Sequence, residues 1–271
     1  MASMALTNYQ LILLDNLIYL NKMIEVNTKK GGECQVSEVI TDLLGNEKLN
    51  KEDSNNEEVS SGEADDKEPD NGEIDIYWKD ELKQDQSDDN PGQCLMNLDE
   101  WKAVLTAIKN DKLLMSLKIT NVFDSDSSAD PNVPSAGTNF RAACFSNDEE
   151  TVIVFRGTHG VYTWNDNGEG GYQADTASQQ EALNYVNLLG ANLTTSGKIT
   201  VTGHSKGGNL AQYVTICAAY LVVDRCVSFD GQGFSNEDTV TSKTTIPLRL
   251  CAMLSLLGCP GFARYKGVKI A

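Results

Sequence analysis

A serine flanked by glycines stands between a β-like run and an apolar, helix-like run. The segment 199–211 reads Ile-Thr-Val-Thr-Gly-His-Ser-Lys-Gly-Gly-Asn-Leu-Ala, so Ser205 is the centre of a Gly-x-Ser-x-Gly motif. Glycines two residues before and after the serine allow a tight turn from which its hydroxyl projects. The helix start adds the positive end of its dipole, and the amide of Lys206 can donate to a developing oxyanion. This context favours a nucleophilic serine over an ordinary glycine-rich turn.

A second string precedes this motif and carries a family resemblance. Residues 152–158 read Val-Ile-Val-Phe-Arg-Gly-Thr, a predicted strand that ends in Arg-Gly-Thr. Phe-Arg-Gly-Thr, followed by Trp164 and Asp166 and then by Gly-His-Ser-x-Gly-Gly, resembles the class 3 lipases. The elbow is still more similar to that of bacterial lipase-like proteins long classed as a domain of unknown function, which reads Gly-His-Ser-Lys-Gly-Gly-Asn-Leu-Ala. The segment 229–234 resembles that family's Asp-Gly-Pro-Gly-Phe, with Gln232 in place of proline.

The resemblance, which runs from about residue 7 to residue 234, implies an α/β-hydrolase fold that acts on esters. It makes Ser205 the nucleophile and assigns the oxyanion hole to the backbone amides of Thr158 and Lys206. Two donors on separate loops are what acyl transfer needs around a tetrahedral intermediate. For Thr158 the alternative is a residue of an ordinary Gly-Thr turn at a strand end. This chemistry requires no cofactor, and seven cysteines without a Cys-x-x-Cys pair argue against a zinc site.

The acid and the base of a catalytic triad are less well defined. Asp230 follows a β-like run, where a triad acid is expected, although Asp-Gly is also a common turn pair and the acid of class 3 lipases usually follows one strand later. In this fold the histidine follows the acid in the chain, yet both histidines precede Asp230. His204, in the variable position of the elbow, is expected to be structural. His159, beside Thr158, could approach Ser205 and serve as the base.

The preferred function is a serine esterase or lipase-like hydrolase that cleaves small-molecule or lipid carboxylic esters through an acyl-enzyme on Ser205. The alternative is a hydrolase-fold binding protein in which the elbow is present but the triad lacks its downstream histidine. A third possibility is an acidic scaffold that acts through residues 47–89. It would leave the Gly-x-Ser-x-Gly and Arg-Gly-Thr motifs unexplained. The oligomeric state is not predicted.

The surrounding elements predict an α/β sheet, mostly parallel and flanked by helices. Thr7 begins a capping box ahead of one helix, and a second helix carries the apolar stripe of Trp101, Val104, Leu105 and Ile108. A third helix is capped at Thr176, has Leu183, Val186 and Leu189 on its inner face, and stops at Gly190. The remaining predicted elements are a hairpin of 140–145 and 151–156, strands at 198–202 and 226–230, and a helix at 206–221.

Composition sets the limits of the other expectations. The 271 residues carry a net charge of −17, which disfavours binding to nucleic acid. An odd set of cysteines suits a reduced, cytoplasmic protein, and no apolar run reaches the roughly 20 residues of a membrane span.

Residues 47–89 hold 17 acidic side chains and five lysines, and this segment is too polar to fold alone. The expected parts are an N-terminal helical part (1–46), an acidic insertion or linker (47–92), the α/β-hydrolase core (93–238) and an atypical basic C-terminal segment (239–271).

Overall fold

The computed structural model describes residues 5–44, 98–125, 140–158, 175–192 and 197–234, together with the backbone of 251–254. The acidic insertion at 47–92 and most of the segment 239–271 lie outside these residues, as does His159.

One mixed sheet forms the centre of the fold, with its seven strands in sequential order from β1 to β7. The first four strands pair antiparallel, and β4 to β7 pair parallel. The strands are β1 (Cys34–Gln35), β2 (Lys118–Asp124), β3 (Arg141–Ser146), β4 (Glu150–Phe155), β5 (Lys198–His204), β6 (Arg225–Phe229) and β7 (Cys251–Leu254). The α/β expectation is confirmed, and β7 adds a strand from within the C-terminal segment.

The expectation of a mostly parallel sheet is wrong, because three of the six pairings are antiparallel. The predicted hairpin explains part of this half: β3 and β4 are joined by a short turn in which the Asn147 side chain accepts hydrogen bonds from the amides of Glu149 and Glu150, each 2.9 Å. A turn that short can join only antiparallel strands. Parallel neighbours need a longer crossover, and in this chain helices make it.

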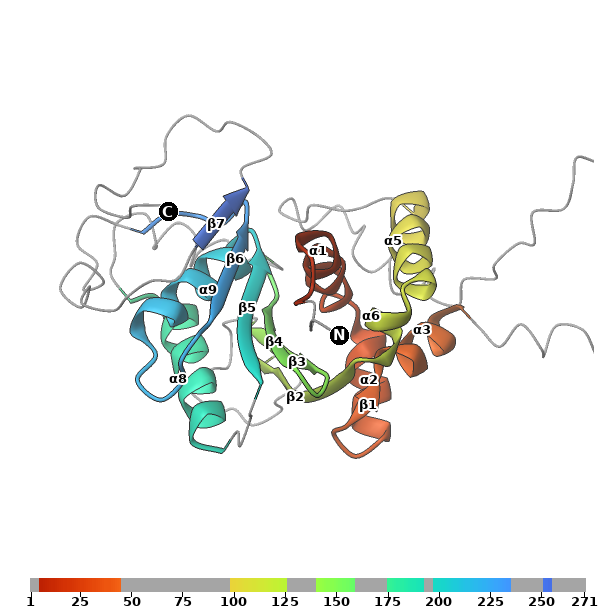
Figure 1. The fold of residues 1–271 in the computed structure, drawn as a ribbon, viewed down its shortest axis with the longest axis horizontal. Helices are drawn as coiled ribbons and strands as arrows, with labels where there is room; N and C mark the ends of the chain where they lie inside the picture. Colours follow the sequence, from red (N-terminus) through yellow and green to blue (C-terminus); the bar gives the residue numbers. More distant parts are fainter. Residues whose placement is uncertain are drawn as a thin grey trace, which may run out of the picture.

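Helices cover both faces of the sheet (Figure 1). One face carries α8 (Ala177–Asn192), which connects β4 to β5, and α9 (Lys206–Cys217), which connects β5 to β6. The other face carries α1 (Asn8–Leu17), α2 (Asn21–Lys29), α3 (Val36–Leu44), α5 (Leu98–Asn110) and α6 (Lys112–Ser116). Within the described part of the chain, no helix is both long and apolar enough to cross a bilayer.

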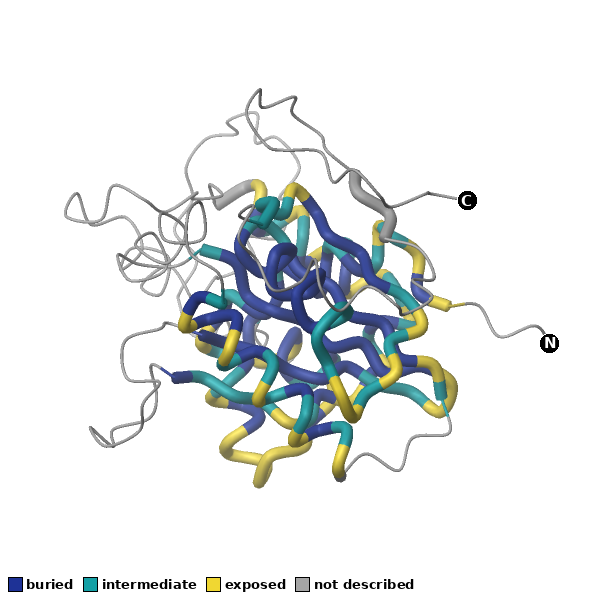
Figure 2. Tube along the Cα trace, turned by 90° about the vertical axis from the view of Figure 1, so that its left-hand side faces the viewer, coloured by how far each residue is buried: buried dark blue, intermediate teal, exposed yellow. Residues whose placement is uncertain are grey.

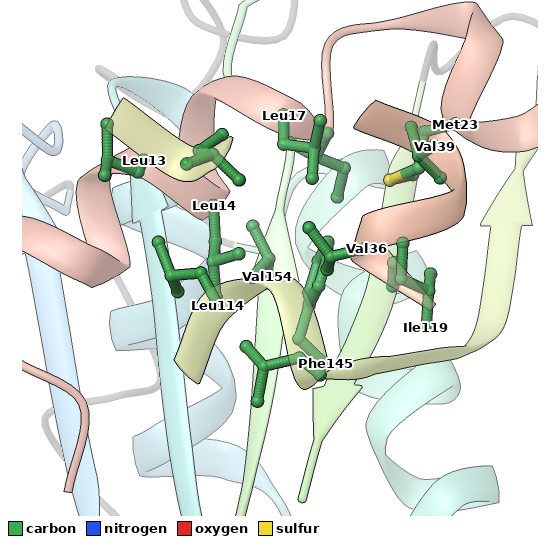
Figure 3. Close-up of a cluster of buried hydrophobic side chains, with 14 of the residues drawn as sticks. Leu13, Leu14, Leu17, Met23, Val36, Val39, Leu114, Ile119, Phe145 and Val154 are labelled. Atoms are coloured by element: carbon green, nitrogen blue, oxygen red, sulfur yellow. The ribbon is translucent and has the colours of Figure 1, made fainter. Parts of the chain in front are cut away.

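The alternation of side chains along β4 divides the core into two clusters. Val152 and Val154 pack with the helices of the N-terminal half, whereas Ile153 and Phe155 pack with α8 and α9. This is the period-two pattern of a strand buried on both faces. Figure 2 shows the buried chain running through the middle of the molecule. In Figure 3, side chains from the N-terminal helices gather over the sheet, where Phe145 and Val154 meet them.

Local signals placed the starts of the helices better than their ends. The capping boxes at Thr7 and Thr176 are both present. However, α8 runs past Gly190 to Asn192, and a Cβ at Gly190 would lie 2.5 Å from the Tyr220 carbonyl oxygen. That glycine therefore permits a close contact rather than ending the helix. The helix α9 stops at Cys217, not at 221, because the chain turns extended at Ala218 and leads into β6.

Arg141 of β3 attaches the N-terminal helices to the sheet. Its side chain is 2% exposed and donates to the carbonyls of Ile18 and Tyr19, at 3.2 and 3.1 Å, and to the Asn21 side chain at 2.8 Å. It also forms a buried ion pair with Asp124 of β2, at 2.9 Å. One guanidinium thus holds the junction between α1 and α2 against two strands.

Asp15 of α1 is a buried acid in contact with β5. It is 1% exposed, and the Thr202 hydroxyl donates to its Oδ2 at 3.0 Å. Burial raises the pKa of Asp15 well above its ordinary value, and the hydrogen bond from Thr202 lowers it by a smaller amount. The neutral acid is therefore the form that the folded protein favours.

We expect the wild-type free energy of unfolding to fall, relative to that of Asp15→Asn, as the pH rises. Because the folded pKa is raised, the folded state holds its proton above about pH 3.9, where the unfolded carboxyl loses it. The relative loss begins near the unfolded pKa, proceeds at up to about 1.4 kcal/mol per pH unit, and ends once the folded pKa is passed. Urea unfolding of both proteins at several values from pH 4 to pH 8 measures how the difference between their free energies of unfolding changes. A difference that stays constant over this range would contradict a raised pKa.

Candidate active site

Ser205 occupies a sharp turn between β5 and α9. Its backbone has φ 54° and ψ −123°, with φ in the positive region that residues other than glycine rarely adopt. A Cβ at Gly203 would lie 2.3 Å from the carbonyl carbon of Gly207, and one at Gly207 would lie 2.1 Å from the Phe155 carbonyl oxygen. The two glycines of the motif therefore let the turn fold back on itself and let α9 start directly against the end of β4.

The end of β4 brings Thr158 beside Ser205. The strands β4 and β5 run parallel, with Phe155 opposite Gly203, so the segments that follow them leave the same edge of the sheet. The hydroxyls of Thr158 and Ser205 are 3.3 Å apart. Gly157 makes this approach possible, because a Cβ there would lie 2.5 Å from the His204 carbonyl oxygen and 2.1 Å from the Tyr19 hydroxyl.

Lys206 is the first residue of α9 and is 1% exposed. The backbone N–H groups of a helix's first turn point along its axis toward the N-terminus, where the positive end of the dipole lies. Ser205 is the N-cap of this helix, so its hydroxyl belongs to a residue at that end. The site thus combines a serine hydroxyl, a threonine hydroxyl and a helix N-terminus.

Asp230 lies next to the turn at the end of the neighbouring strand. The amide of Ser205 donates to the carbonyl of Phe229 at 2.9 Å, and Asp230 follows directly, exposed and with φ 51°. His204 is half-buried. Burial lowers the pKa of His204, and the negative charge of Asp230 partly opposes this. The favoured form of His204 at neutral pH is therefore the uncharged imidazole.

The structure brings together Ser205, Thr158, Lys206 and Asp230, whereas His159 lies outside the described residues. Within those residues His204 is the only histidine, and no hydrogen bond joins its imidazole to Ser205.

Sequence reasoning did not single out the polar side chains behind this site. Asn209 and Tyr213 of α9 are buried and bond to segments far away in the chain. The available signal was a pair of polar residues four apart in the helix, a spacing that places both on one face. Their partners, Gln179 and Asp175, have no comparable local pattern.

Comparison with known families adds one finding. Residues 117–246 match the Mbeg1-like family. This family is lipase-like. The match starts just before β2, spans slightly less than half of the chain, and includes Thr158, Ser205 and Asp230. It leaves out the helices α1 to α6, including the segment that supplies Tyr19. No curated protein matches the chain.

The Mbeg1-like match agrees with the lipase-like part of the resemblance read from the motifs. It does not address the relation to class 3 lipases in particular.

Proposed function

We propose that the chain is a serine hydrolase of the α/β-hydrolase fold that cleaves carboxylic esters through an acyl-enzyme on Ser205. The observation that carries the proposal is the turn itself: a serine at positive φ between a parallel strand and a helix, with its hydroxyl 3.3 Å from that of Thr158. A strained turn of this kind is the usual way in which such enzymes present their nucleophile. The Mbeg1-like match supports a hydrolase of lipase type.

In the proposed reaction, Ser205 Oγ attacks the ester carbonyl carbon while a base takes its proton. The carbonyl oxygen becomes an oxyanion that accepts hydrogen bonds from the backbone amides of Thr158 and Lys206. When the tetrahedral intermediate collapses, the alcohol leaves with a proton and the acyl group stays on Ser205. Water then attacks the acyl-enzyme, releases the acid and restores the serine hydroxyl.

Asp230 is proposed as the acid that orients the base, since it follows the strand next to the nucleophile. For the base itself we propose His159, which follows Thr158 directly in the chain. A histidine on the oxyanion loop would depart from the usual order of the triad, in which the base follows the acid. Substituting His159 with alanine in an active protein, with folding checked by circular dichroism, tests this assignment.

A hydrolase-fold binding protein is the second candidate function. It is favoured by the order of the residues in the chain, because neither His159 nor His204 follows Asp230, where the base of this fold is expected. Two measurements separate the candidates: labelling by a fluorophosphonate, and hydrolysis of p-nitrophenyl esters with short and long acyl chains. Labelling of Ser205 together with turnover identifies the enzyme. A folded protein that neither reacts nor turns over would be the binding protein.

We propose that the Thr158 hydroxyl adds a third donor to the two backbone amides of the oxyanion hole, and we expect Thr158→Val to lower ester turnover about a hundredfold, the typical cost of losing one such donor. Valine keeps the β-branched shape and the backbone amide but removes the hydroxyl that lies 3.3 Å from Ser205 Oγ. Thr158→Ser is the matched control, because it retains a hydroxyl, and it should keep most of the activity. Full activity in the valine variant would restrict the role of Thr158 to its amide.

A further inference from the structure

Two buried side chains on α9, Asn209 and Tyr213, each connect the start of α8 with the loop that follows β6. They are 2% and 3% exposed and four residues apart, so they lie on one face of the helix. Asn209 is only four residues beyond Ser205. The loop after β6 begins with Asp230, and the start of α8 follows the chain that leaves Thr158. These two residues therefore join the loop that carries Asp230 to the start of α8, which Asn209 contacts about one helical turn beyond Ser205.

Asn209 makes the first connection with both ends of its amide. Its Oδ1 accepts a hydrogen bond from Gln179 Nε2 at 3.0 Å, and its Nδ2 donates to the carbonyls of Gln232 and Gly233, each at 3.2 Å. Gln179 is itself held, because its Oε1 accepts from the amide of Thr176 at 2.9 Å. Only an amide side chain can accept on one side and donate twice on the other in this way.

Tyr213 makes the second connection one turn later. Its hydroxyl donates to Asp175 Oδ1 at 2.5 Å, and its ring centroid lies 6.2 Å from that of Phe234. Burial, and the hydrogen bond to Asp175, raise the pKa of Tyr213, so the phenol keeps its proton and remains a donor. Asp175 has φ 55°, a conformation that a non-glycine residue keeps only when its surroundings hold it there.

The loop after β6 has little room to shift against α9. A Cβ at Gly208 would lie 2.9 Å from Gly231 Cα and 2.5 Å from Ser228 Oγ. The backbone of α9 therefore packs directly against the loop. Ser228 is also tied to α9, because Gln212 Nε2 donates to its hydroxyl at 2.8 Å. The position of this loop relative to α9, and so of Asp230 relative to Ser205, is defined by these contacts and by the two connections above.

We propose that Asn209 and Tyr213 are positioning residues that hold Asp230 and the start of α8 in place around Ser205. The Asn209 backbone amide donates to the Ser205 carbonyl at 3.2 Å, but neither side chain bonds to Ser205 within the described residues, so both side chains act through the loops they join. The proposal rests on the proposed function, because positioning affects a rate only if Ser205 reacts. Displacing a catalytic group by about 1 Å can cost a hundredfold in rate.

The test measures turnover per reactive serine. Variants Asn209→Leu, which keeps the side-chain shape, and Tyr213→Phe, which removes only the hydroxyl, are compared with the wild type. The control on the same helix is Thr215→Val, since the Thr215 hydroxyl donates to the Ala211 carbonyl at 2.6 Å and has no bond outside α9 among the described residues. Titration with a fluorophosphonate counts the reactive sites, so loss of folded protein does not alter kcat. KM and the thermal unfolding temperature are measured in parallel.

We expect Asn209→Leu and Tyr213→Phe to lower kcat per titrated site by about tenfold to a hundredfold with KM little changed, and Thr215→Val to match the wild type. Asp175→Asn, which keeps an oxygen for Tyr213, should retain more activity than Tyr213→Phe. The proposal is overturned if Asn209→Leu and Tyr213→Phe keep the wild-type kcat per site and only unfold at a lower temperature. If the wild type itself is neither labelled nor active, the proposed function fails and this inference fails with it.

Discussion

Replacing Ser205 with alanine is expected to abolish fluorophosphonate labelling and to lower ester turnover about a millionfold. The methyl group leaves the turn in place but provides no nucleophile, so no acyl-enzyme can form. The N-terminus of α9 and the end of β4, which border Ser205, are unchanged by the substitution. Residual activity should therefore come only from substrate binding and oxyanion stabilisation.

Ser116→Ala is the matched control for this result. Ser116 is exposed at the end of α6, and its hydroxyl donates to the nearby carbonyl of Leu113, at 2.8 Å. This variant should label and turn over like the wild type. Labelling that persists in Ser205→Ala would mean that another nucleophile reacts, and the proposed function would then be wrong.

Replacing Arg141 with methionine is expected to lower the free energy of unfolding by about 3 to 5 kcal/mol, the usual cost of removing one partner from a buried ion pair. The change removes the ion pair with Asp124 and the hydrogen bonds to residues 18, 19 and 21. The site should be affected too, since the Tyr19 hydroxyl lies against Gly157 in the turn that carries Thr158. Urea unfolding followed by circular dichroism measures the loss of stability.

The double variant Arg141→Met with Asp124→Leu shows how much of this loss belongs to the ion pair. Replacing both charges with apolar groups avoids a buried carboxylate that has lost its arginine, so the double variant should lose less stability than the two single variants added together. A loss below about 1 kcal/mol for Arg141→Met, the size typical of surface ion pairs, would show that other contacts attach the N-terminal helices.

Several features of this fold follow from short segments of sequence. The capping boxes at Thr7 and Thr176, the hairpin around Asn147 and the strand-to-helix turn at Ser205 are all recognisable locally. In each of them the interacting groups lie within a few residues of one another, so their spacing in the chain is nearly their spacing in space. The same holds for the continuous apolar run of β4, which is typical of a strand buried on both faces.

Other features depended on which distant segments meet. The antiparallel half of the sheet includes β2, whose β-forming residues are interrupted by Asn121 at φ 51°, within the register shift between Thr120 and Phe123. Gly190 looked like a helix stop, but its backbone is in contact with Tyr220, which only the folded chain brings near. Local propensity is a weak guide where tertiary contacts decide.

The sequence by itself therefore determined the candidate nucleophile, its turn and the α/β class, because glycine spacing and helix capping are short-range properties. The family resemblance already placed Thr158 beside Ser205, but only the tertiary structure gave the 3.3 Å distance between their hydroxyls and showed that Arg141 holds the N-terminal helices. It also decided that Asn209 and Tyr213 connect α8 to the loop after β6. These contacts are hydrogen bonds between residues far apart in the chain, and nothing in the local pattern around each partner identifies the other.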